Sequence, residues 1–101
     1  MGTRIELQSL LEEILGSRNV YFQPPETVKM SYPAIVYSCD GIDNVYADDT
    51  VYMQSLEYQI TVIDKNPDSD IWLKVSRIPK CRHDRNFKSD NLNHYVFTLI
   101  Y

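Results

Sequence analysis

The residues best suited to metal chemistry are His83 and Asp84, which Asp48, Asp49 or Asp90 could join as further ligands. Imidazole and carboxylate groups are competent ligands for divalent metals. However, His83 and Asp84 are neighbours in a segment that we expect to be a strand, where successive side chains point to opposite faces. Their spacing also matches no established metal motif. We therefore predict no metal site and interpret this segment as a solvated, charged strand.

The segment from Asp40 to Asp49 resembles a calcium-binding loop only in its acidity. An EF-hand loop needs oxygen ligands at its first, third and fifth positions, whereas Ile42 occupies the third position here. The sequence therefore excludes an EF-hand. A solvated loop is the favoured interpretation, and a weak calcium or magnesium site is the alternative.

No nucleophile or phosphate-binding loop can be assigned from the sequence. Cys39 and Cys81 lie in no recognisable nucleophile turn, and two such distant cysteines favour reduced thiols over a disulfide scaffold. The only glycines, Gly2, Gly16 and Gly41, are too far apart for a Gly-rich phosphate loop. We therefore predict that the protein is not an enzyme and has no catalytic residues, cofactor or bound metal.

The charged residues are unevenly distributed along a chain whose net charge is -4. Residues 1–50 hold eight acidic and three basic residues, and four of the acidic ones crowd a short stretch: Asp40, Asp43, Asp48 and Asp49. Residues 74–88 form a basic stretch that contains Lys74, Arg77, Lys80, Arg82, Arg85 and Lys88, with Asp84 as its single acidic residue. This stretch could bind nucleic acid, with Phe87 stacking on a base. The pI near 5.0 favours a protein-facing or solvated surface instead, so we expect no sequence-specific nucleic-acid partner.

Length and composition are typical of one globular domain. The chain has 101 residues, of which 44% are hydrophobic and 24% are charged, and a domain of this size buries roughly 60 to 65% of its unfolded surface. We therefore expect a single domain that spans residues 1–101. The apolar runs fall far short of the roughly 20 residues that cross a bilayer, so we expect no membrane partner.

The first expected element is a helix over about residues 3–15. Thr3 and Glu6 have the spacing of a capping box, and Gly16 can adopt the left-handed conformation that ends a helix. Apolar residues recur between them at the spacing of one helix face: Leu7, Leu10, Leu11, Ile14 and Leu15. This pattern predicts a helix that packs on a sheet.

The remaining elements are expected to be five strands and a second helix. Strands are predicted at residues 20–22, 34–39, 50–64, 81–88 and 95–101, with a long hairpin loop at 40–49 and a turn at 89–91. Alternation in the third strand places Tyr52, Leu56, Tyr58, Ile60 and Val62 on one face. Asn66 and Pro67 are expected to begin the second helix, which Pro79 ends. The order α-β-β-β-α-β-β predicts an α+β fold with a mainly antiparallel sheet of four to five strands and both helices on one face.

Taken as a whole, the chain resembles the small tail-terminator, or tail-completion, proteins encoded among the head-tail joining genes of long-tailed phages and prophages of Gram-positive bacteria. The resemblance covers nearly the full length. It rests on the segments RIELQSLLEEILGSRNVYFQPP, MSYPAIVY, CDGIDNVYADD, YQITVIDKNPDSDIW and SDNLNHYVFTLIY. These segments are signatures of fold and assembly and name no active residues.

This resemblance implies a virion structural protein, made in the bacterial host cytoplasm, that acts at the head-tail joint. It implies a homo-oligomeric ring, commonly a hexamer, that caps the tail tube and joins it to the head. The expected partners are other copies of the chain, the major tail tube protein and the head-completion or connector proteins. Head-closure and adaptor proteins of the same joint have similar sizes, so they are alternatives to the tail terminator at that joint. The alternative function is a small metal-dependent enzyme or a nucleic-acid-binding module.

A head-to-tail ring needs two different, complementary patches on each subunit. The acidic loop and the basic segment provide a pair of opposite charge, and tyrosine is common at interfaces. The expected interface residues are therefore Asp40, Asp43, Tyr46, Asp48, Asp49, Arg82, Arg85 and Tyr101.

Overall fold

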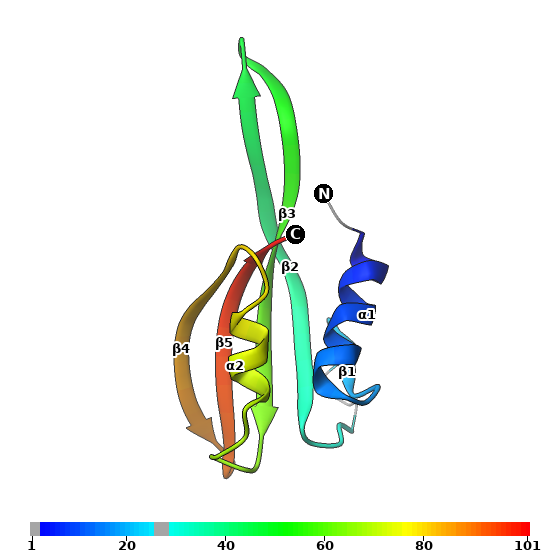
Figure 1. Cartoon of the computed structure of the whole chain (residues 1–101), viewed down its shortest axis with the longest axis vertical. Helices are drawn as coiled ribbons and strands as arrows, with labels where there is room; N and C mark the ends of the chain where they lie inside the picture. Colours follow the sequence, from blue (N-terminus) through cyan, green and yellow to red (C-terminus); the bar gives the residue numbers. More distant parts are fainter. Residues whose placement is uncertain (1–2, 26–28) are drawn as a thin grey trace.

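The protein is described from a computed structural model, which covers residues 3–25 and 29–101; the side chains of residues 43, 45–47 and 51–53 lie outside the described set. Its elements are α1 (Arg4–Leu15), β1 (Val20–Phe22), β2 (Ala34–Ala47), β3 (Thr50–Asp64), α2 (Ile71–Ser76), β4 (Cys81–Ser89) and β5 (Leu92–Ile100). The five strands form one sheet in the order β1-β2-β3-β5-β4 (Figure 1). The predicted α+β fold and element order are confirmed. The sheet is mixed, because β1 is parallel to β2 while the other neighbours are antiparallel.

Helix α1 begins and ends where the sequence predicts. The Thr3 hydroxyl accepts a hydrogen bond from the Glu6 backbone N–H at 3.1 Å, which satisfies one of the free donors at the helix start. Gly16 has a φ of 79°, and its N–H donates to the Glu12 carbonyl at 2.9 Å. This left-handed cap suits glycine because it has no Cβ to clash.

The core lies between the two helices and one face of the sheet. Leu7, Leu11 and Leu15 of α1 are buried there. From β3 the core receives Tyr58 and Ile60, as the alternation of that strand predicts. The remaining buried members of the cluster are Val20, Ile35, Tyr37, Val62, Val75, Ile78, Tyr95, Phe97 and Leu99.

A partly buried polar contact fixes α1 against the sheet. The hydroxyl of Tyr37 donates to Gln8 Oε1 at 2.5 Å, and Gln8 Nε2 donates to the Val20 carbonyl at 3.0 Å. Gln8 therefore links the helix to both β1 and β2.

Helix α2 is shorter than predicted, and the expected start at Asn66 and Pro67 is wrong. The Asn66 N–H donates to Asp64 Oδ1 at 2.9 Å, and Asn66 Oδ1 accepts from the Asp68 N–H at 3.0 Å. Such side-chain bonds to the backbone compete with a helical turn. The chain therefore remains in turns until Ile71.

The predicted loop at residues 40–49 is also wrong. Strand β2 continues to Ala47, paired with β3, and the turn consists of Asp48 and Asp49 with φ angles of 52° and 62°. Asp and Asn tolerate this left-handed conformation, which a two-residue hairpin turn requires. Backbone pairing with the strand-forming residues after Thr50 thus outweighs the low strand propensity of residues 40–44.

The last hairpin closes in the same way. Asp90 and Asn91 have φ angles of 52° and 61°, which confirms a turn close to the predicted one. Strand β5 begins at Leu92, three residues before the predicted start at 95. No helix among the described residues is both long and apolar enough to cross a membrane.

Candidate subunit interface

The β2–β3 hairpin extends beyond the rest of the sheet as an arm, which we define as residues 41–55. On one side, β1 ends opposite Tyr37, and the Gln23 side chain accepts the Cys39 N–H at 3.2 Å. On the other side, β5 ends opposite Glu57. Within the described chain, the strands of the arm therefore pair only with each other. The arm projects from the body in Figure 1 and contributes to an elongated molecule of 50 × 24 × 23 Å.

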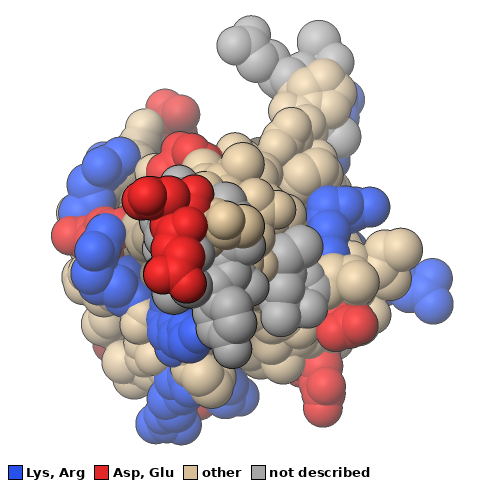
Figure 2. All heavy atoms as spheres, turned by 90° about the horizontal axis from the view of Figure 1, so that it is seen from above, with Lys and Arg blue, Asp and Glu red and all other residues tan. Residues whose placement is uncertain are grey.

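The arm belongs to an acidic part of the chain. Residues 34–64, which contain both strands of the hairpin, include six acidic residues and no Lys, Arg or His. Asp48 and Asp49 are exposed at the tip, and Asp40 is exposed near the base of the arm. Figure 2, which views the molecule from the arm end, shows acidic atoms near the centre. The arm therefore presents negative charge away from the body.

Strand β4 is the basic counterpart of the arm. It is the outermost strand beside β5, and all its residues after Cys81 are exposed. It carries Arg82, Arg85 and Lys88. In Figure 2, Lys and Arg atoms gather on the left, the side on which Figure 1 places β4. This edge strand offers a basic surface together with a backbone edge that has no neighbour in the described chain.

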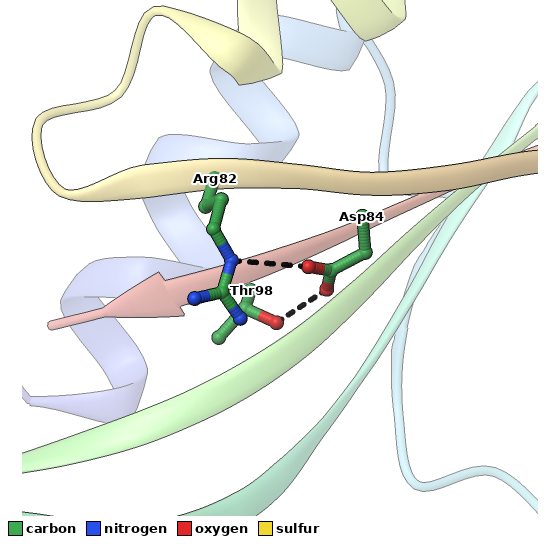
Figure 3. A network of polar contacts seen from close by, with 3 residues as sticks. All are labelled: Arg82, Asp84 and Thr98. Carbon is green, nitrogen blue, oxygen red and sulfur yellow. Dashed lines mark hydrogen bonds and ion pairs between the residues drawn. The ribbon is translucent and has the colours of Figure 1, made fainter.

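A polar network organises the beginning of β4 (Figure 3). Asp84 lies at a register shift between His83 and Arg85, the mark of a β-bulge. Its carboxylate accepts a hydrogen bond from the Thr98 hydroxyl of β5 and another from Arg82 Nε at 3.1 Å. The Thr98 hydrogen bond, assisted by Arg82, lowers the pKa of Asp84 although partial burial opposes this shift. Arg82 therefore has an ion-pair partner in its own chain.

His83 points to the helix-bearing face, opposite to Asp84. Its ring centroid lies 6.0 Å from that of Trp72 and 5.4 Å from that of Phe97, in an edge contact with Phe97. The prediction that His83 and Asp84 face opposite sides is confirmed. Among the described residues, no group of three or more His, Cys, Asp or Glu side chains is arranged to hold a metal ion, and no pocket is found.

Beyond the bulge, β4 carries an aromatic contact on the helix-free face of the sheet. The rings of Phe87 and His94 stack at a centroid distance of 4.6 Å, and the guanidinium of Arg85 lies 5.8 Å from the Phe87 ring centre. Phe87 is still 43% exposed. On the arm, Ile42 is 60% exposed. Each of the two charged surfaces therefore includes an exposed apolar side chain.

The predicted interface residues fall into separate groups. Asp40, Asp48 and Asp49 lie on or beside the arm, whereas Arg82 and Arg85 lie on β4. Within one chain the arm points away from the body to which β4 belongs (Figure 1), so the structure does not bring these groups together. The side chains of Asp43 and Tyr46 lie outside the described residues.

Tyr101, another predicted interface residue, directly follows β5. It is partly buried, packs against the core, and donates its N–H to the Leu56 carbonyl at 3.0 Å.

Sequence reasoning missed Thr98 and Ile42. Nothing in the sequence marks Thr98 as the partner of Asp84, because the two residues meet only through strand pairing. Ile42 could have been noticed as a lone apolar residue in an acidic stretch.

Comparisons of the chain with protein-family models, with curated proteins and with solved structures found no match.

Proposed function

We propose that this chain is a virion structural protein of a long-tailed phage or prophage, and that its copies form a ring that caps the tail tube and joins the tail to the head. The proposal starts from the resemblance of the sequence to tail-terminator proteins. One structural observation supports it: a single chain carries an acidic projecting arm and a basic edge strand on different parts of its surface.

Complementary patches on one chain favour head-to-tail assembly. When a surface binds a different surface on the next copy, the contact is heterologous, and a suitable rotation closes the copies into a ring. Opposite charges at the two patches accelerate encounter and define which surfaces meet. Other copies of this chain are thus the first partner, and the tail tube and the connector proteins bind the completed ring. The proposed role is structural and involves no turnover.

The direct test is electron microscopy of the purified protein, alone and after mixing with tail tubes assembled from the major tube protein of the same genome. We expect closed rings and tubes that carry a cap at one end. A protein that stays monomeric and never decorates tube ends would contradict the proposal. So would a gene that lies among metabolic genes instead of between the capsid or portal genes and the tail genes.

A shortened arm provides a matched variant. Leu56 directs its carbonyl to Tyr101, so the neighbouring pair of Asp43 and Ser55 is the hydrogen-bonded one, and residues 44–54 can be replaced by an Asn-Gly turn without changing the strand register below them. The body should remain folded, since none of the side chains that the structure describes in this segment belongs to the core cluster. We expect this variant to lose ring formation. Replacing Asp90 and Asn91 by Asn and Gly at the other hairpin is the control and should leave rings intact.

A further inference from the structure

We propose that the contact between neighbouring copies is a shared β-sheet, in which the β2 edge of one arm, residues 41–47, pairs with residues 85–89 of β4 in the next copy. This inference deepens the proposed ring, because it names the segments that join its subunits and the kind of bond between them.

The first support is that both segments have a free backbone edge. In an antiparallel ladder, alternate residues direct their N–H and C=O groups away from the paired strand. Strand β4 has only β5 as a neighbour, and in the arm β2 has only β3 within the described chain. Long, uncovered edges of this kind are templates for pairing with another chain.

The second support is the sign of the charges, which selects a heterologous contact. Two arms would bring acidic residues together, and two β4 edges would bring basic residues together, so like pairs repel. The β2 side of the arm is the acidic one: Asp40 precedes residues 41–47 and Asp48 follows them, whereas residues 50–55 of β3 carry no charge. An arm from one copy and β4 from another are the combination in which the charges attract.

The third support is the position of the bulge. Asp84 is fixed there by Thr98 and Arg82, and a bulge interrupts the regular spacing that a neighbouring strand needs. Regular pairing is therefore available from Arg85 to Ser89. The bulge therefore sets one end of the proposed ladder. Arg85 and Lys88 lie within this ladder, and neither has an ion-pair partner among the described residues. Phe87 and Ile42 supply exposed apolar surface beside it.

The test combines cross-linking with hydrogen exchange in full-length protein. In a background with Cys39→Ser and Cys81→Ala, one variant carries Ile42→Cys, and a second set carries Cys at position 85, 86, 87 or 88. Circular dichroism first confirms that each variant is folded. We expect a short bismaleimide to link the arm variant to β4 variants in an equal mixture, and each variant alone to give no linked dimer. Linked dimers from the Ile42→Cys variant alone would show arm-to-arm pairing and overturn the proposal.

Hydrogen exchange separates a shared sheet from a contact between side chains. We expect the outward-facing amides, which belong to alternate residues within 41–47 and 85–89, to become protected when the ring forms at low salt. Rings without this protection would overturn the shared sheet and leave the proposed function standing. Cross-linked oligomers that never cap tail tubes would have the opposite meaning, since the strand pairing would be supported and the tail-terminator role refuted.

Charge reversal identifies the attracting residues. Arg85→Glu with Lys88→Glu should abolish the ring at low salt, and adding Asp40→Lys with Asp48→Lys should partly restore it. Arg18→Glu with Arg77→Glu causes the same change of net charge elsewhere and serves as the control. Arg82 is left unchanged, because its replacement would also disturb Asp84. Normal rings from the Arg85 and Lys88 double variant at low salt, where screening is weakest, would contradict the charge-selected contact.

Discussion

The carboxylate of Asp84 on β4 accepts a hydrogen bond from the hydroxyl of Thr98 on β5, at the bulge where the register of the two strands shifts. The two residues are 14 positions apart in the sequence. Because Arg82 also donates to Asp84, one carboxylate holds both strands at the bulge.

Removing the Thr98 hydroxyl should raise the pKa of Asp84. Thr98→Val preserves the side-chain shape but removes the hydrogen bond that is the main cause of the lowered pKa. A carboxyl whose pKa is lower in the folded state stabilises the protein above its unfolded pKa of about 4, and this contribution is lost as the pH falls through the folded value. The wild type should thus lose this stability in acid below about pH 4.

The measurement for this prediction is an NMR titration of the Asp84 carboxyl, together with urea unfolding at pH 7 and pH 3. We expect Thr98→Val to destabilise the protein more at pH 7 than at pH 3. Thr61→Val is the control. Thr61 lies on β3 and faces the same side of the sheet as Thr98, but β5 separates its strand from β4, which carries Asp84. Equal pKa values for Asp84 in wild type and Thr98→Val would contradict the assignment.

Truncating the buried face of α1 should be costly. Leu11 is fully buried in the core, so Leu11→Ala leaves a cavity and should lower the free energy of unfolding by about 2 to 5 kcal/mol. Ile5 lies on the same helix and is 70% exposed, so Ile5→Ala should change it by less than about 0.5 kcal/mol. Urea titration of both variants compares the two faces directly. Similar losses in both would mean that the buried face is wrongly assigned.

The contact between Tyr37 and Gln8 should be visible as a coupling energy. Tyr37 is 1% exposed, and its hydroxyl donates to Gln8 Oε1 and accepts a longer bond of 3.4 Å from Arg4. Tyr37→Phe should lower the free energy of unfolding by about 1 to 2 kcal/mol. In a double-mutant cycle with Gln8→Ala, we expect the two effects to be less than additive. Strict additivity would show that the hydroxyl and the amide do not interact.

The two thiols should differ in their reactivity. Cys81 is half-buried, and burial, with a smaller contribution from Asp84, raises its pKa to about 11. Since the thiolate is the reactive form, only about one molecule in a thousand is reactive at Cys81 at pH 8. Cys39 is exposed.

Iodoacetamide labelling at pH 8, followed by peptide mass spectrometry, should modify Cys39 well before Cys81. The rate at Cys81 should continue to rise as the pH increases toward 11. The Cys39→Ser variant isolates the slow site. Rapid labelling of Cys81 in this variant at pH 8 would show that the thiol is more accessible than the structure indicates.

The sequence alone determined the elements whose signals are local. The Thr3 cap, the leucine spacing and Gly16 define α1 within one segment of chain, and the alternation at Tyr58 and Ile60 reveals which face of β3 is buried. Such patterns depend on the geometry of a single helix or strand, so they can be recognised without knowing what that element packs against.

The tertiary structure decided what depends on pairing between distant segments. Residues 40–47 have the composition of a loop, yet they form a strand because β3 satisfies their backbone groups. Likewise, the placement of β5 between β3 and β4 brings Thr98 to Asp84 and leaves the basic strand on the edge. The projecting arm and the free edge of β4 both arise from strand order and unequal strand length, and neither property is encoded in a local pattern of residue types.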